Sequence, residues 1–173
     1  MEETSSYKSD RILEEIHKRR QKPEAGEVEA SKVKLVIFTL GTHHYALFGE
    51  EVKEILTMLR IYPVPGTPAF ILGIVNVRGD IQSVIDINLF LGQPGTEPTP
   101  RSRIIIAEKA GVRSGILVDS VEDVLDVSQT AIQKTLSTLN DSVRSFVAGE
   151  LTYKHHNVTV LDAGQLFEKM TES

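Results

Sequence analysis

The chain has 173 residues and a formal net charge of −5, with 19 Lys and Arg against 24 Asp and Glu. This mildly acidic balance argues against a nucleic-acid-binding surface, which needs a dense basic stripe. The absence of cysteine excludes disulfides, cysteine-ligated metal clusters and a thiol nucleophile. No run approaches the roughly 20 apolar residues of a membrane helix, and the polar N-terminus does not resemble a secretory signal. We therefore expect a cytoplasmic globular protein.

Residues 1–31 are rich in charge and poor in large apolar side chains. We interpret them as a charged tail, with a short amphipathic helix from Asp10 to about Gln21 as the alternative. The composition changes at residue 32. The apolar run 33–40, a Gly-Thr-His turn and a second apolar run predict a hairpin. Three prolines then exclude a helix over residues 61–68.

A second hairpin is predicted from residues 71–77 and 81–87, which flank the turn Arg78-Gly79-Asp80. Three prolines and two glycines mark residues 92–100 as a linker. The second half then repeats this organisation, with apolar β-type runs and a final helical segment at residues 103–107, 115–127, 146–151, 158–162 and 163–170.

The two halves are related in sequence. Residues 35–56 align with 104–125, and residues 69–91 align with 145–167, with one longer loop accounting for the change of shift. Such a repeat indicates a duplicated unit. Each unit alone buries too little apolar surface, and five short strands favour a small closed barrel. We predict a domain over 32–173 that contains one barrel at about 33–92 and a second at about 101–170, with a binding groove between them.

Asp86 and Asp162 stand at equivalent places after apolar strands. Paired carboxylates can serve acid–base or metal chemistry. Each aspartate, however, immediately precedes a helical segment and can accept N–H bonds from its first turn, so we expect helix capping. The pairs His43-His44 and His155-His156 lie beside turns and lack the ligand set of a zinc site, so we interpret them as solvated turn residues.

The sequence contains no nucleophile elbow, P-loop or dinucleotide-binding motif. We therefore predict no catalytic residue, no metal and no cofactor. Arg78 lies at a hairpin tip, and its counterpart in the repeat is Lys154. Arg78 is either a solvated cation or a fixed guanidinium that binds a partner. Glu54 is either a solvent-facing strand residue or a contact at the rim of an apolar face.

The first half resembles the CheW family of bacterial chemotaxis adaptors. The most specific block is Asn76-Val77-Arg78-Gly79, and the resemblance extends through the second half, over about residues 33–170. The N-terminal extension of about 30 residues exceeds the family minimum and leaves room for a specialised partner. The matching positions of the first half are Phe38, Leu40, Tyr45, Val52, Glu54, Ile55, Pro65, Pro68, Gly73, Asn76, Arg78, Gly79, Asp86, Leu91 and Gly92.

The resemblance implies a mainly β fold of two pseudo-symmetric five-stranded SH3-like barrels without catalytic activity. It implies an adaptor that couples transmembrane chemoreceptors to the histidine kinase CheA, in arrays at the inner membrane. A CheW-like adaptor of a non-flagellar pathway is the alternative. The receptor hairpin tip would pack in the groove between the barrels, and the kinase's CheW-like regulatory domain would contact the barrel ends. The implied groove residues are Val52, Glu54, Ile55, Arg78, Gly115 and Val118. The residues assigned to the kinase-facing end are Ile61, Pro65 and Phe70.

Overall fold

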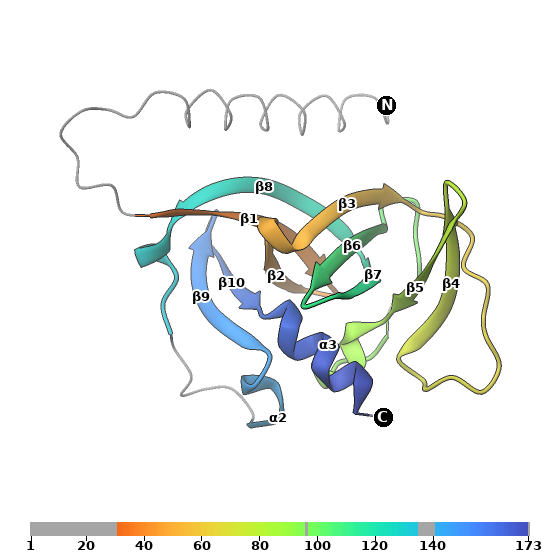
Figure 1. The fold of residues 1–173 in the computed structure, drawn as a ribbon. Helices are drawn as coiled ribbons and strands as arrows, with labels where there is room; N and C mark the ends of the chain where they lie inside the picture. The colour runs from red at the N-terminus through yellow and green to blue at the C-terminus, as the bar shows by residue number, and fades with distance from the viewer. Residues whose placement is uncertain (1–30, 96, 135–140, 173) are drawn as a thin grey trace.

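The computed structural model describes residues 31–95, 97–134 and 141–172. The predicted tail and its alternative helix therefore lie, apart from Ser31, outside the described residues. Strands β1 to β10 form two five-stranded sheets, with short helices at their ends (Figure 1). The described part contains no helix that is long and apolar enough to cross a membrane.

Sheet A has the strand order β8-β1-β2-β10-β9. Neighbours are antiparallel except β2 and β10, which pair in parallel. The strands are β8 (Ser120–Ser128), β1 (Lys32–Leu40), β2 (His43–Phe48), β10 (His156–Leu161) and β9 (Val147–Tyr153).

Sheet B has the order β3-β6-β7-β5-β4, again with one parallel pair, β5 and β7. Its strands are β3 (Val52–Thr57), β6 (Arg103–Lys109), β7 (Val112–Val118), β5 (Asp80–Ile85) and β4 (Ile71–Val77). The described helices are η1 (Gly49–Glu51), η2 (Ile87–Leu89), η3 (Gln129–Ala131), α2 (Asp141–Arg144) and α3 (Ala163–Thr171).

The predicted duplication is confirmed by the strand order. The strand order of sheet B becomes that of sheet A when each of its strands is replaced by its counterpart in the repeat. The predicted caps are confirmed as well. The Asp86 carboxylate accepts a bond of 2.9 Å from the N–H of Asn88, and that of Asp162 accepts one of 3.1 Å from the N–H of Gln165.

The prediction of one barrel over 33–92 and another over 101–170 is wrong, because each sheet combines strands of both halves. After β2, the turn η1 leads the chain out of sheet A into β3 of sheet B. In the second half, the apolar run predicted as one strand over 115–127 divides at Asp119 into β7 of sheet B and β8 of sheet A. Hairpin patterns specify only the pairing of sequence neighbours, so they could not reveal this exchange.

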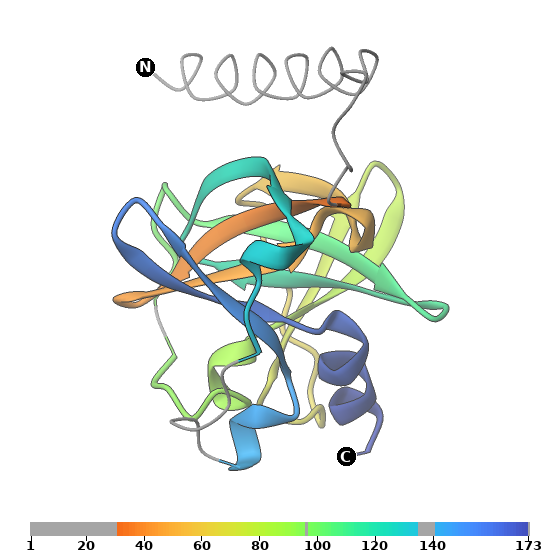
Figure 2. The same ribbon diagram turned by 90° about the vertical axis from the view of Figure 1, so that its left-hand side faces the viewer.

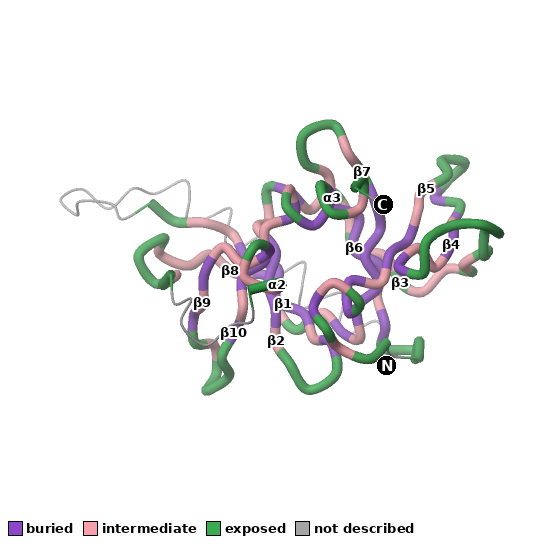
Figure 3. The backbone as a smooth tube through the Cα atoms, turned by 90° about the horizontal axis from the view of Figure 1, so that it is seen from below, coloured by how far each residue is buried: buried purple, intermediate pink, exposed green. Residues whose placement is uncertain are grey.

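Buried residues are concentrated in the strands of both sheets (Figure 3). They form three apolar clusters. Alternate side chains of each sheet point into its own interior, since successive strand residues face opposite sides. The other set forms a central core between the sheets. This core fills the seam in which we predicted an open groove. Large members of the central core include Phe38, Leu47, Ile105, Ile116 and Phe167.

Candidate functional site

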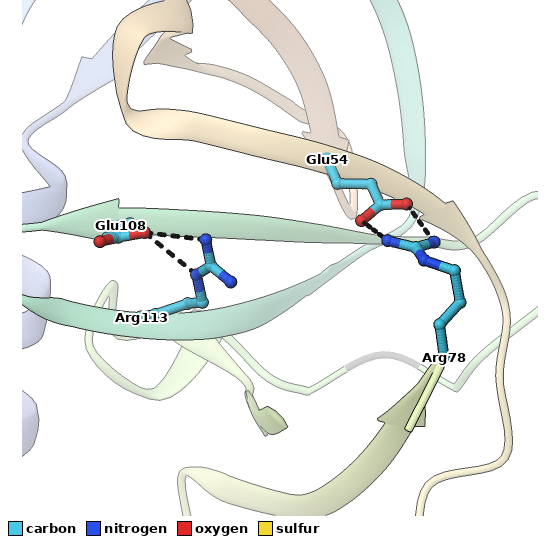
Figure 4. A network of polar contacts seen from close by, with 4 residues as sticks. All are labelled: Glu54, Arg78, Glu108 and Arg113. Carbon is cyan, nitrogen blue, oxygen red and sulfur yellow. Dashed lines mark hydrogen bonds and ion pairs between the residues drawn. The ribbon is translucent and has the colours of Figure 1, made fainter. Parts of the chain in front are cut away.

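Glu54 and Arg78 join the two outer strands of sheet B at one end (Figure 4). Nη1 and Nη2 of Arg78 each donate a 2.7 Å bond to one carboxylate oxygen of Glu54. Arg78 has φ 50° and Gly79 φ 91°, which suits the tight turn of a two-residue hairpin. The Oδ1 atom of Asn76 accepts a 2.7 Å bond from the N–H of Gly79 and fixes this turn. The turn thus aims Arg78 at β3.

The Arg78 guanidinium is held in place but remains accessible. Its side chain is 71% exposed, whereas that of Glu54 is 33% exposed. The hydrogen bond from Arg78 lowers the pKa of Glu54 and raises that of Arg78, because it stabilises the charged form of both groups. The contact therefore favours the charged form of both groups.

A second ion pair lies beside the first. Nε and Nη2 of Arg113 both lie 3.0 Å from Oε2 of Glu108, on the hairpin of β6 and β7 (Figure 4). The positive charge of Arg113 also contributes to the lowered pKa of Glu54. By strand alternation, Glu54, Glu108 and Arg113 continue the rows of inward-facing side chains of sheet B. We call Glu54, Arg78, Glu108 and Arg113 the charged end of sheet B.

The predicted groove residues fall into two groups. Glu54 and Arg78 are brought together, whereas Ile55, 37% exposed, follows Glu54 on β3 and faces the opposite side of the strand. Val52 is half-buried and packs against the central core. Gly115 and Val118 are buried, so neither can touch a partner directly, and their prediction as contacts is wrong. A Cβ on Gly115 would lie 2.8 Å from Cγ2 of Ile104, which shows that this glycine allows close strand packing.

The residues assigned to the kinase-facing end also differ in exposure. Pro65 is exposed and Ile61 is half-buried. Phe70 is only 7% exposed and belongs to the central core, so its prediction as a contact is wrong. Phe70 instead packs against Phe90 with the two rings tilted and their centroids 4.9 Å apart. The sequence around Phe70 is mostly apolar, so its pattern does not indicate which side chains are buried.

The sequence analysis missed an apolar patch on β4 and β5. Tyr62 is 48% and Ile81 is 59% exposed, and half-buried Ile74 lies between them. Two backbone bonds of 2.8 and 2.9 Å pair Tyr62 with Ile74. The cross-strand pairs Ile74–Ser83 and Asn76–Ile81 put these residues on one face of the hairpin. Strand alternation around the turn could have identified Ile81. We call Tyr62, Ile74 and Ile81 the apolar patch.

The equivalent end of sheet A carries different chemistry. Asp123, the counterpart of Glu54, accepts a 2.5 Å bond from the hydroxyl of Tyr153. Burial and this hydrogen bond raise the pKa of Tyr153. Lys154, the counterpart of Arg78, has the similar φ of 44° and places Nζ 5.3 Å from the Tyr153 ring centroid. The described residues include no cluster of three His, Cys, Asp or Glu that could hold a metal ion.

Two of the predicted turn histidines are in contact with each other. The rings of His44 and His156 stack with centroids 4.1 Å apart. His44 is half-buried, so its interpretation as a solvated turn residue is wrong, whereas His43 and His155 are exposed. The parallel pairing of β2 with β10 brings the two rings together. Local sequence carries no signal for a contact between residues so far apart in the chain.

One buried carboxylate lies where the chain passes from one sheet to the other. Glu51 of η1 is 5% exposed, and its Oε1 atom lies 3.4 Å from Nζ of Lys109. Burial raises the pKa of Glu51 more strongly than Lys109 lowers it. Removing a charge from water is costly unless a partner compensates for it. Glu51 therefore has a structural position at the sheet junction.

Comparison with known proteins identifies the fold. A family model described as CheW-like domain matches residues 34–170. Chemotaxis protein CheW of Rhizobium meliloti is 33% identical over 133 residues, covering 77% of this chain and 86% of the relative. Probable chemotaxis protein CheW of Rhizobium etli is 32% identical over 139 residues, covering 80% and 89%. The crystal structure of the scaffolding protein TtCheW from Thermoanaerobacter tengcongensis superposes with a TM-score of 0.67 at 30% identity, covering 76% of this chain and 90% of that one. The chain therefore belongs to the CheW-like domain family.

Proposed function

We propose that this protein is a chemotaxis adaptor that couples transmembrane chemoreceptors to a CheA-type histidine kinase. Its membership of the CheW-like domain family supports this role, as do relatives named as chemotaxis and scaffolding proteins. The adaptor catalyses no reaction. It acts by holding two partners in register and by passing on a change in their geometry or population. It works in the cytoplasm and is recruited to receptor arrays at the inner membrane.

The receptor binds at the charged end of sheet B. The observation that carries this assignment is a guanidinium fixed by two hydrogen bonds and yet 71% exposed. An Arg78 that is already held by Glu54 loses little further conformational freedom when it meets a polar group of a partner. Ile55, the next residue of β3, is exposed on the opposite face of this outer strand. A helical hairpin with an apolar ridge and flanking polar groups fits this combination.

The kinase binds at the apolar patch. Ile81 of β5 and Tyr62, which pairs with Ile74 of β4, expose large apolar side chains on one face. Aromatic and apolar anchors of this kind dominate the energetics of protein interfaces. Arg60 adds a cation 4.9 Å from the centroid of the Tyr62 ring. The patch lies near the predicted residues Ile61 and Pro65, and it takes the place of the buried Phe70 as the main contact.

Co-sedimentation with receptor-containing membranes and CheA tests both assignments. We expect Arg78→Ala to weaken receptor binding roughly tenfold and to leave kinase binding intact, because a charge-assisted contact is lost. We expect Ile81→Asp to have the opposite selectivity. Each variant is thus the control for the other, and circular dichroism checks that both fold. If both proteins still bind receptor and kinase normally, the two surfaces are assigned wrongly.

The receptors that co-purify decide between a flagellar and a non-flagellar pathway. Both pathways require the same scaffold, so the surfaces above do not distinguish them. Pull-down from the native cell followed by identification of the bound receptors provides the answer. Recovery of no chemoreceptor and no histidine kinase would contradict the adaptor role itself.

A further inference from the structure

A hollow of about 480 Å³ is lined by residues in and around η2, α2 and α3. These short helices gather on one side of the sheets (Figures 1 and 2). Leu89, Phe90 and Phe146 give it an apolar lining, and Leu89 is 50% exposed. The rings of Phe90 and Phe146 lie 5.9 Å apart. A large exposed leucine beside two aromatic rings is a surface that gains from being covered.

The duplication explains why the hollow exists. Helices η2 and α3 both begin at a capping aspartate, yet η2 has three residues and α3 has nine. The first half turns away at Gly92, which has φ 68°, before a second helical turn can form. The apolar end of η2 is therefore left facing the side of α3. A helical segment is the element that would complete this side of the molecule.

The rim of the hollow is acidic. Helix α3 contributes Glu168, Lys169 and Glu172 to it. Lys169 forms an ion pair of 3.6 Å with Glu172. Within the described residues, Glu168 has no cationic partner, so the rim has one uncompensated negative charge. An occupant that combines apolar side chains with positive charge fits both the lining and the rim.

The chain contains a segment of this chemistry outside the described residues. In the sequence of residues 11–22, Ile12, Leu13 and Ile16 have the spacing of one helical face, and Lys18-Arg19-Arg20 and Lys22 follow. We propose that this segment docks in the hollow of its own chain. Its isoleucines and leucine cover Leu89 and Phe90, and its basic run lies against Glu168 and Glu172.

The connection to this segment has a maximum reach that can be compared with the size of the domain. Nine residues, 23–31, separate the segment from the start of β1 at Lys32. Extended, they span about 30 Å, whereas a domain of this size has a radius of gyration of about 14 Å. Tethering also raises the effective concentration to the millimolar range, so weak contacts are sufficient. Charge selects between the exposed apolar surfaces, because the apolar patch carries Arg60 beside the Tyr62 ring, and this cation repels a basic segment.

Paramagnetic relaxation enhancement on the full chain tests the proposal. The protein has no native cysteine, so Gln21→Cys provides a single site for a spin label. We expect the label to broaden the amide signals of Gly92, Gln165 and Glu168 in the same molecule. Arg19→Glu with Arg20→Glu should abolish this broadening, and Glu168→Lys should weaken it. The three substitutions together should restore it. Asp80→Lys, an equal charge change at the β4–β5 turn, is the control and should have no effect.

Three outcomes would overturn the proposal. The first is the absence of broadening around the hollow in labelled Gln21→Cys protein that carries no charge substitution. The second is broadening that is confined to the apolar patch. The third is broadening that arises between molecules, seen when labelled protein is mixed with unlabelled, isotopically enriched protein, which would assign the contact to a second copy. None of these outcomes alters the receptor and kinase assignments, because the hollow shares no residue with those surfaces.

Discussion

The equivalent ends of the two sheets show how a duplicated fold acquires different surfaces. In sheet B, Glu54 meets an exposed arginine from the hairpin tip through two charged hydrogen bonds. In sheet A, Asp123 meets a tyrosine hydroxyl instead, and Lys154 lies over the tyrosine ring. Both contacts join outer strands, so the acidic position has the same architectural role. The exposed cation at the sheet B end is thus fixed by two charged hydrogen bonds, whereas Lys154 at the sheet A end is held against an aromatic ring.

The largest expected difference between the two sheets is at Gly73 and Gly149. These glycines occupy equivalent positions, but their surroundings constrain a substitution differently. A Cβ on Gly73 would lie 2.2 Å from the Tyr62 carbonyl oxygen at a φ of 150°, whereas one on Gly149 would lie 2.5 Å from a side-chain carbon of Ile132. We expect Gly73→Ala to lower the free energy of unfolding by about 3 kcal/mol or more. Gly149→Ala should cost less, about 1–3 kcal/mol, because its closest neighbour is a side-chain carbon and the nearest backbone atom, the Gln133 carbonyl oxygen, lies farther away at 3.0 Å. Urea denaturation measures both, and equal losses would contradict the distinction.

Loss of the Asp123–Tyr153 contact in sheet A should lower the free energy of unfolding by less than the glycine substitutions do. Tyr153→Phe removes the hydroxyl donor and leaves Asp123 with the N–H of Val124. We expect the free energy of unfolding to fall by about 1 kcal/mol. In sheet B, Arg78→Ala should leave the unfolding transition nearly unchanged, because exposed ion pairs contribute little to stability. Thermal denaturation of both variants compares the two ends directly. A larger loss for Arg78→Ala would show that the charged end holds the sheet together.

Two carboxylates should respond to pH in opposite directions. Burial raises the pKa of Glu51 above 4.5, so the folded state loses stability as the pH rises through that raised value. Arg78 lowers the pKa of Glu54 below 4.5, so stability from this pair is present above pH 4.5 and lost as the pH falls through the lowered value. Glu51→Gln should therefore gain stability relative to the unmodified protein as the pH rises above about 4.5. The free energy of unfolding of Glu54→Gln should be closest to that of the unmodified protein at acid pH.

Urea denaturation at a series of pH values measures the two effects. The Glu54 effect should be the smaller one, because its environment is solvent-exposed and screened. The same pH trend for both variants would show that their environments do not differ as described.

Much of the fold follows from the sequence because the hairpins and the repeat are local or periodic signals. The run 33–40, the turn at Arg78 and the caps at Asp86 and Asp162 all have the predicted structure. The exchange of strands between halves could not be predicted. At Asp119 neither glycine nor proline interrupts the apolar run, and the crossing is fixed by distant contacts, such as the 2.9 Å bond from its N–H to the carbonyl oxygen of Thr39.

The candidate site was only partly predictable for the same reason. The pattern around Glu54 and Arg78 identified both residues, but their contact depends on two outer strands meeting in space. The family resemblance also pointed to Val118, because resemblance marks positions and does not separate a surface residue from a core residue. Ile81 was missed, although its outward place follows from alternation. Exposure is the information that sequence alone did not provide.

The affinity of receptor-containing membranes for Arg78→Ala and Lys154→Ala, measured by titration, tests the central claim most directly. The two substitutions remove a cation from equivalent hairpin tips, at φ 50° and 44°, so each is the matched control for the other. We predict roughly tenfold weaker receptor binding for Arg78→Ala and unchanged binding for Lys154→Ala. Equal affinities for the two variants, or a loss confined to Lys154→Ala, would contradict the assignment of the receptor to the charged end of sheet B.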